Sequence, residues 1–184
     1  MDKEKLNKIL DNHKLWLKTN GEQGERADLR YANLRSADLS YADLRSANLR
    51  SADLSYANLS YANLRYANLS YANLRYANLR YANLSYANLS YANLRYANLS
   101  YANLSYADLR NADLDFSAFP LWCGGLDVNI DDKQATQLLY HLVRNVQYSK
   151  NTSAEMKKLC MMKSIIKKAN KFHRVKECGE IGDK

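Results

Sequence analysis

The chain has 184 residues, of which 47% are hydrophobic and 25% charged, and its formal net charge is +8. This composition is that of an ordinary soluble protein, and no apolar run approaches the ~20 residues of a membrane-spanning helix. The three cysteines show no paired spacing, which argues against a disulfide framework or a zinc site. Free thiols and the lack of a signal-peptide core lead us to expect a cytoplasmic protein.

The first predicted element is a helix over residues 3–19. Apolar side chains recur there at helical spacing and share one face with His13. The apolar members of this face are Leu6, Ile9, Leu10, Trp16 and Leu17. Asn20 and Gly21 supply a stop signal. We interpret residues 1–26 as an N-terminal helical cap.

From residue 27 the chain becomes a tandem repeat. Leucine recurs every five residues from Leu29 to Leu114, in eighteen copies of Ala-(Asp/Asn)-Leu, sixteen of which continue with (Arg/Ser)-(Tyr/Ser). On an α-helix five residues advance by ~500°, so the leucines would scatter around the cylinder. On a flat strand an odd spacing sends successive leucines to opposite faces. A chain that turns a corner once per repeat instead buries every leucine, together with the small alanine two places earlier.

This repeat resembles that of the pentapeptide-repeat family, as found in bacteria and prophages. The resemblance implies an all-β solenoid, namely a right-handed quadrilateral β-helix with four repeats per coil. Residues 27–119 then form about 4–5 coils, with Phe119 in the last repeat. Residues twenty apart should stack, so asparagines and tyrosines should form ladders outside. Three tyrosine ladders are expected, starting at Tyr41, Tyr56 and Tyr66, and Phe116 should close the second.

Residues 120–184 are predicted to form a C-terminal cap with two helices, because the open end of a solenoid invites association. The first helix should begin at Asp131, paired with Gln134 in a capping-box arrangement. Its expected apolar face consists of Leu138, Leu139, Leu142, Val143 and Val146. The second, basic helix should span about Ser153 to Val175. Its apolar residues are Met156, Leu159, Met162, Ile166 and Ala169.

Nothing in the sequence indicates catalysis. There is no glycine-rich phosphate loop, no GxSxG and no HExxH. The repeat aspartates alternate with asparagine, which is typical of an outward polar position. His13, His141 and His173 all fall in the predicted caps, and a metal site would need three or four converging ligands. We therefore expect no enzyme activity, no cofactor and no metal.

Two surfaces are candidates for binding. Tyr and Arg are favoured at binding hot spots, although the tyrosines have an alternative role as stabilising ladders. The candidate partner-binding residues are Tyr41, Tyr61, Tyr81, Tyr101, Arg35, Arg75 and Arg95. The stretch from Lys150 to Lys176 has nine basic residues and one acidic residue, which suits nucleic acid, a solvated face or a dimer. The candidate nucleic-acid contacts are Lys157, Lys158, Lys163, Lys167, Lys168 and Lys171.

The leading prediction is therefore a non-catalytic macromolecule-binding or scaffold protein whose partner is an unidentified protein. The first alternative is a nucleic-acid-associated protein acting through the basic C-terminal helix. The family resemblance adds a gyrase-interacting protein that mimics DNA. Nine arginines and seven aspartates in residues 27–119 disfavour mimicry, because it needs an acidic surface. No membrane contact is expected, and a homodimer through the C-terminal helices remains open.

Overall fold

The computed structural model describes residues 1–118, 129–148, 153–154, 158 and 163–169. The chain divides into two compact units, Met1–Asn129 and Ile130–Lys184, and each is described by itself. Within the described residues, no helix is both long and apolar enough to cross a membrane.

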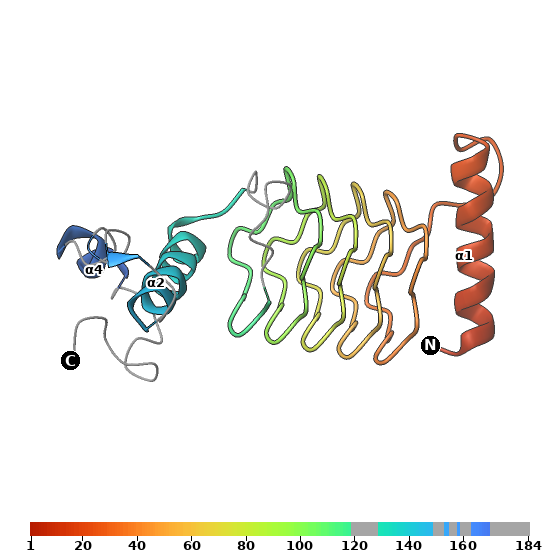
Figure 1. Cartoon of the computed structure of the whole chain (residues 1–184). Coiled ribbons are helices and arrows are strands. Elements are labelled where there is room, and N and C mark those ends of the chain that lie inside the picture. Colours follow the sequence, from red (N-terminus) through yellow and green to blue (C-terminus); the bar gives the residue numbers. More distant parts are fainter. Residues whose placement is uncertain (119–128, 149–152, 155–157, 159–162, 170–184) are drawn as a thin grey trace. The chain divides into compact units, whose positions relative to one another are not determined.

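The first unit begins with α1 (Lys3–Lys18), drawn in red in Figure 1. Asp2 is the N-cap, and its side chain accepts a hydrogen bond from a backbone N–H of the first turn at 2.7 Å. Beyond the last turn, Asn20 and Gly21 have φ angles of 52° and 92°. Such left-handed residues end helices, so the predicted helix and its stop are confirmed.

Each five-residue repeat consists of one straight segment and one turn. In the first repeat, Asp28 Oδ1 accepts the backbone N–H of Arg30 at 3.2 Å, which is an Asx turn. The N–H of Ala32 then donates to the carbonyl of Leu29 at 3.2 Å. Tyr31 lies inside this turn with φ 58°, the left-handed conformation that a type II turn requires. These features recur through the repeats, so the chain changes direction every five residues.

Successive coils pair through residues twenty apart. Asp28 forms a parallel bridge with Asn48, and the same offset links the following repeats. The N–H of Leu29 donates to Asn48 O at 2.7 Å, and the N–H of Asn48 donates to Ala27 O at 2.9 Å. A final bridge joins Asp108 to Asn129, an offset of twenty-one. Strand pairing in this unit therefore continues to Asn129, beyond the repeats themselves.

Leucine and alanine fill the inside of the solenoid, as predicted. All eighteen repeat leucines are at most 3% exposed. Burying one leucine side chain stabilises the fold by about 1.5–3 kcal/mol before entropy is counted. The repeat alanines are buried from Ala47 onward, whereas Ala32, Ala37 and Ala42 of the first coil stay partly exposed.

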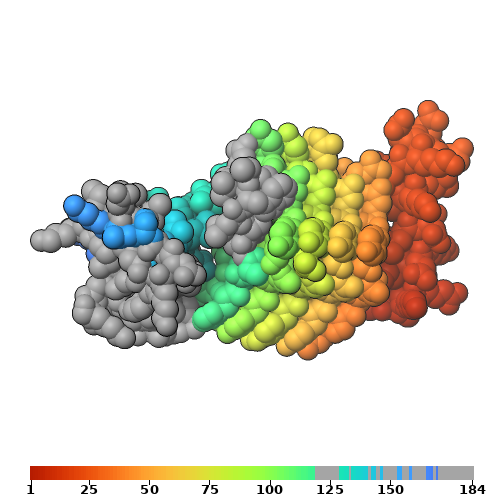
Figure 2. Space-filling view, viewed as in Figure 1, coloured from red at the N-terminus to blue at the C-terminus, as the bar shows by residue number. Residues whose placement is uncertain are grey.

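Helix α1 lies against the first coil, where Figure 2 shows its red atoms in contact with the orange repeats. The N–H of Ala27 donates to His13 Nδ1 at 3.1 Å, and the N-terminal amino group donates to Asn33 O at 2.9 Å. His13 is fully buried, and this burial lowers its pKa. The imidazole is therefore neutral and carries its proton on Nε2.

The second unit contains α2 (Asp132–Tyr148) and α4 (Lys163–Ala169), which pack against each other. The N–H of Asp131 donates to Gln134 Oε1 at 3.2 Å. The N–H of Gln134 donates back to Asp131 Oδ1 at 3.2 Å. These reciprocal bonds confirm the predicted capping box at the start of α2.

The core of this helix pair differs in part from the prediction. Leu142 was expected on the apolar face of α2 but is 52% exposed, so that assignment was wrong. Tyr140 is fully buried instead, because α4 covers the side of α2 on which Tyr140 and Val143 lie. The other packed residues are Leu139, Val146, Ile165, Ile166 and Ala169. The predicted apolar positions Met156, Leu159 and Met162 lie outside the described residues.

Candidate partner-binding surface

Stacked aromatic rings run along the outer corners of the solenoid. Neighbouring rings have centroids 4.8–4.9 Å apart and planes within 27° of each other. The three predicted ladders are confirmed: Tyr41, Tyr61, Tyr81 and Tyr101; Tyr56, Tyr76, Tyr96 and Phe116; and Tyr66, Tyr86 and Tyr106. A further pair, Tyr71 on Tyr91, follows from the same twenty-residue offset but was not among the predicted ladders.

These rings remain accessible while they stack. The exposed fraction of a repeat tyrosine ranges from 37% at Tyr81 and Tyr96 to 74% at Tyr41. Tyrosine supplies a large amphipathic contact area with few rotatable bonds, and stacking orders the ring before any partner arrives. The ladders therefore offer contact area at a small entropic cost.

The Asp/Asn position of a repeat determines where the arginine two residues later lies. Arg30, Arg45 and Arg110 follow an aspartate, and each forms an ion pair with it at 2.6–2.7 Å. Six arginines follow an asparagine, and each lies over an aromatic ring with Cζ 4.6–5.8 Å from the nearest centroid. They are Arg35, Arg50, Arg65, Arg75, Arg80 and Arg95. Asparagine offers no negative charge, so the guanidinium takes the π face instead.

The ion pairs also affect the aspartates. Hydrogen bonds from Arg30 hold the pKa of Asp28 below its ordinary value, and Arg110 does the same for the pKa of Asp108. At Asp43, burial raises the pKa, but the hydrogen bonds from Arg45 outweigh it and the pKa is lowered. All three carboxylates are thus charged acceptors that hold their arginine away from the rings.

The predicted surface residues border one side of the solenoid. Tyr41, Tyr61, Tyr81 and Tyr101 mark one corner, and Arg35, Arg75 and Arg95 mark the preceding corner. The repeats between them are residues 37–41, 57–61, 77–81 and 97–101, and we call this the tyrosine-bordered side. Along it, Asn58 Nδ2 donates to Asp38 Oδ1 and Asn78 Nδ2 donates to Asn58 Oδ1, both at 3.2 Å. This confirms the lower part of the predicted asparagine ladder.

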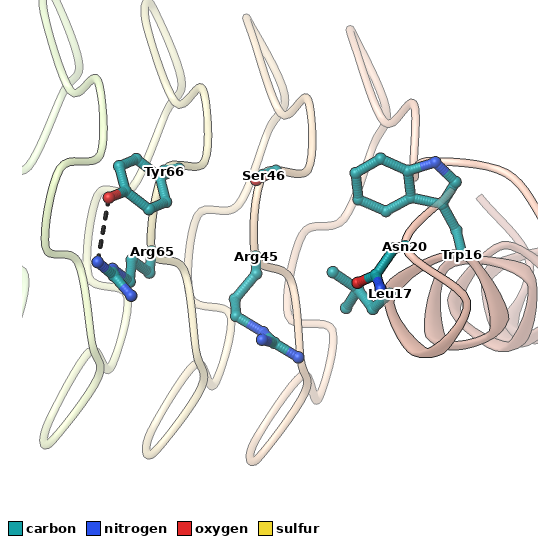
Figure 3. Close-up of a pocket in the computed structure, with 7 residues that line it drawn as sticks. All are labelled: Trp16, Leu17, Asn20, Arg45, Ser46, Arg65 and Tyr66. Atoms are coloured by element: carbon teal, nitrogen blue, oxygen red, sulfur yellow. Dashed lines mark hydrogen bonds between the residues drawn. The ribbon is translucent and has the colours of Figure 1, made fainter. Parts of the chain in front are cut away.

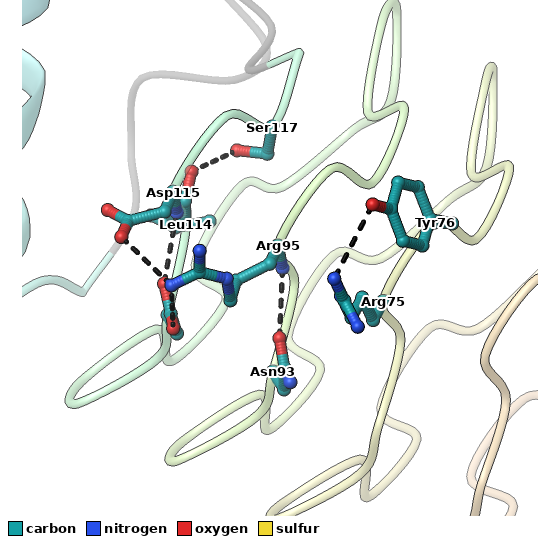
Figure 4. A network of polar contacts seen from close by, with 8 residues as sticks. Arg75, Tyr76, Asn93, Arg95, Leu114, Asp115 and Ser117 are labelled. Atoms are coloured by element: carbon teal, nitrogen blue, oxygen red, sulfur yellow. Dashed lines mark hydrogen bonds and ion pairs between the residues drawn. The ribbon is translucent and has the colours of Figure 1, made fainter.

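The arginines of this side differ in their availability. Arg95 Nη1 lies 3.2 Å from Asp115 Oδ2 and 3.5 Å from Asp113 Oδ2, as Figure 4 shows in part. The Asp115 side chain is only 2% exposed, so this contact compensates a buried charge. In the same view Arg75 donates to the Tyr76 hydroxyl at 3.4 Å. Within the described part of the chain, Arg75 has no carboxylate at ion-pair distance.

Arg80 also belongs to this side, although the sequence interpretation left it out. Its Nη2 donates to the Tyr81 hydroxyl at 3.2 Å, and its Cζ lies 4.6 Å from the Tyr81 ring centroid. Arg35 occupies the start of the neighbouring corner and donates to Ser55 Oγ at 3.1 Å. Three stacked arginines, at positions 35, 75 and 80, therefore accompany the two ladders without a carboxylate partner among the described residues.

Most of the side chains predicted to contact nucleic acid lie outside the described residues. Lys158 and Lys167 are exposed, and the side chains of the other four predicted lysines fall outside the described residues. Cys123, Cys160 and His173 also fall outside them. In the described ranges, no three His, Cys, Asp or Glu side chains are arranged to hold a metal ion.

A family model described as pentapeptide repeats matches residues 27–65, 57–95 and 77–115. A pentapeptide repeat protein from Nostoc Pcc 7120 is 36% identical over 66% of this chain and 93% of that chain, with a TM-score of 0.50. No curated protein matches this chain.

Two further solved structures show lower structural similarity. The pentapeptide repeat protein Rfr23 from the cyanobacterium Cyanothece 51142 is 40% identical over 51% of this chain, with a TM-score of 0.45. This chain spans 60% of the length of Rfr23. QnrB1, a plasmid-mediated fluoroquinolone resistance protein, is 25% identical over 68% of this chain and 74% of that chain, with a TM-score of 0.30.

Proposed function

The chain belongs to the pentapeptide-repeat family, whose members are right-handed quadrilateral β-helices, and from this premise we propose that it is a non-catalytic scaffold for a protein partner. The proposed contact surface is the tyrosine-bordered side. The partner would present acidic and apolar groups, because the side offers guanidinium groups and aromatic rings.

One observation carries this proposal. Two exposed aromatic ladders with a 4.8–4.9 Å repeat border the same side, and stacked arginines accompany them. Tyr and Arg are enriched among the few residues that dominate the binding energy of protein interfaces, where the partner excludes water from them. The ladders hold their side chains in place in the free protein, which lowers the entropic cost of binding.

A pull-down with matched ladder variants tests the proposal. Serine occupies the tyrosine position at Ser36, Ser46 and Ser51, so Tyr-to-Ser changes suit the turn. The test variant carries Tyr61→Ser and Tyr81→Ser; the control carries Tyr71→Ser and Tyr91→Ser at the diagonally opposite corner. We expect a defined protein that survives nuclease treatment, is lost with the test variant and is kept with the control. Equal capture by both variants would contradict the proposed surface.

A second candidate function is nucleic-acid association through the basic C-terminal segment. Its support is the net positive charge of residues 120–184, which contain twelve basic and seven acidic residues, together with the exposure of Lys158 and Lys167. Binding of this kind weakens steeply with salt. Loss of the captured material on nuclease treatment, and weaker capture by Lys158→Gln with Lys167→Gln, would favour it. A gyrase-interacting role ranks third because the repeat surface is not acidic.

We also propose how the chain is organised. Residues 1–26 would cap the first of about 4–5 coils, residues 27–119 would form the solenoid, and residues 120–184 would form the C-terminal cap. The bond between His13 and Ala27 supports the first cap. Deleting residues 1–20 should expose a strand edge and cause concentration-dependent association in analytical ultracentrifugation. The same measurement on the full chain tests a homodimer, and the cytoplasm stays the proposed location.

A further inference from the structure

A cavity of 360 Å³ lies where the end of α1 meets the first two coils. It is lined by Trp16, Leu17, Asn20, Arg45, Ser46, Arg65 and Tyr66. All of these residues belong to the first unit. The cavity opens at a different corner from those that border the tyrosine-bordered side.

The cavity occupies the position of a missing ring. Tyr66, Tyr86 and Tyr106 stack along this corner at 4.8–4.9 Å, and Ser46 stands where the next ring would be. In Figure 3, Tyr66, Ser46 and Trp16 follow one another along the corner. The indole of Trp16 therefore lies beyond the serine, and the ladder is interrupted between two aromatic side chains.

Comparison with two other serine corners explains why this position stays open. At Ser36 the preceding Arg35 lies over Tyr56 of the next coil, 4.6 Å from its centroid. At Ser51 the preceding Arg50 lies over Tyr71 in the same way at 5.6 Å.

At Ser46 the corresponding arginine is Arg45, which follows Asp43 and not an asparagine. Arg45 Nε donates to Asp43 Oδ1 at 2.8 Å and Nη2 donates to Oδ2 at 2.7 Å. This bidentate pair holds the guanidinium away from Tyr66. The ring of Tyr66 therefore lacks the cover that Tyr56 and Tyr71 receive from an arginine of the preceding coil, and its arginine contact comes from Arg65 of its own coil.

The wall on the α1 side is held in place by its surroundings. The indole of Trp16 stacks on His13, with centroids 5.6 Å apart and planes 14° from parallel. A Cβ on Gly21 would lie 3.2 Å from Trp16 Nε1, and Gly21 has φ +92°. Glycine at this position therefore lets the loop approach the indole closely, and the loop and His13 together orient the aromatic wall.

The rim of the cavity carries an arginine that no carboxylate neutralises among the described residues. Arg65 Nη2 donates to the Tyr66 hydroxyl at 3.0 Å, and its Cζ lies 4.7 Å from the Tyr66 centroid. The charge of Arg45 is already paired with Asp43. A ligand with one negative group would therefore find its counter-charge at Arg65.

We propose that this cavity binds a small planar aromatic molecule with an anionic group. Its ring takes the missing position in the ladder next to Tyr66, and its anion pairs with Arg65. A nucleoside monophosphate and an aromatic carboxylate share this chemistry. The volume is within the range of small-molecule sites. The proposal does not depend on the macromolecular partner proposed above, because it uses another corner of the solenoid.

The test is an NMR titration that follows the indole N–H signal of Trp16, assigned with the help of Trp122→Phe. The probes are AMP and indole-3-acetate; adenosine lacks the anion and ribose 5-phosphate lacks the ring. We expect a saturable shift with at least one aromatic anion. If AMP binds, adenosine and ribose 5-phosphate should each bind about tenfold more weakly than AMP. The tighter probe identifies phosphate or carboxylate as the source. No saturable shift with either aromatic anion up to about 10 mM, ten times a Kd of about 1 mM, would overturn the proposal.

Two variants with matched controls sharpen the test. Ser46→Tyr supplies the missing ring from the chain itself, and tyrosine already occupies this turn position at thirteen repeats. We expect it to weaken binding at least tenfold without lowering Tm, whereas Ser36→Tyr at another corner leaves binding unchanged. Arg65→Gln should weaken anion binding by about tenfold, while Arg80→Gln should not. Unchanged binding by Ser46→Tyr would overturn the proposal, since the cavity would then not be the site.

Discussion

In the repeat column every leucine is at most 3% exposed, whereas in the helix pair Leu142 is 52% exposed and Tyr140 is fully buried. Both regions contain apolar residues at a regular spacing. In the column each leucine meets the same neighbours, one coil above and one below, so its place in the repeat fixes its burial. In α2 burial depends on the side to which α4 packs.

The two regions therefore show to what extent the periodicity of apolar residues predicts which side chains are buried. With a five-residue period and one turn per repeat, a given repeat position has the same surroundings in every repeat. A helical period permits several neighbouring stripes, and a partner helix selects one of them. The expected effects of mutation follow from this difference, and the largest of them fall in the column.

The largest effect is expected from Leu74→Lys in the middle of the column. Leu74 is fully buried, so the change places an unpaired ammonium among leucines, at a cost of several kcal/mol. We expect loss of the cooperative unfolding transition in circular dichroism. The control Leu142→Lys, on the exposed face of α2, should change stability by no more than about 0.5 kcal/mol. A Leu74→Lys protein with the native Tm would refute the idea that the position of a leucine in the repeat fixes its burial.

The next effect is expected from Tyr140→Ala in the helix pair. Its side chain is fully buried between α2 and α4, and removal of a large buried aromatic costs about 3–5 kcal/mol. The loss should stay within residues 130–184, because the column has its own core. Hydrogen exchange measured by mass spectrometry should show faster exchange there, and unchanged protection over residues 27–118. Equal loss of protection in both units would show that they do not unfold separately.

A smaller effect is expected where a helix and the column meet at His13. Burial lowers its pKa in the folded protein below the ordinary 6.5. The unfolded chain then binds the proton more readily, so stability falls as the pH drops below about 6.5. Tm should decrease between pH 7.5 and 5.5.

The control is His13→Asn, which keeps an acceptor for the N–H of Ala27 and does not titrate. Its Tm should vary less over this interval. The repeat aspartates with lowered pKa values, such as Asp28, lose their stabilising effect only below about pH 4, so they do not contribute there. Parallel Tm curves for the two proteins would exclude His13 as the source of the pH dependence.

The smallest effect concerns arginine placement. Asp43→Asn should release Arg45 to lie over Tyr66, and Asn78→Asp should draw Arg80 away from Tyr81 towards the new carboxylate. Both exchanges are between surface contacts, so stability should change by less than about 1 kcal/mol. The ring-current shift of the arginine side-chain protons measures the move in each direction. Unchanged shifts in both variants would show that the aspartate does not control the arginine.

Most of the column could be predicted, because a turn every five residues allows successive coils to pair in only one alignment. This includes the inward leucines, the stacking at twenty residues and the ladder that Phe116 closes. The first helix and the capping pair of Asp131 with Gln134 were also predictable, since they depend on residues close in sequence. The Tyr71 and Tyr91 pair was present in the same pattern and was overlooked.

By itself, then, the sequence determined the repeat geometry, since a period of five, an Asx side chain and a left-handed turn residue are all local properties. Only the tertiary structure decided which arginines stack on rings, why the position next to Ser46 is open, and that Tyr140 replaces Leu142 in the helix core. These outcomes depend on which groups compete for one side chain. That competition is settled by distances across coils and between helices, which a periodic pattern does not contain.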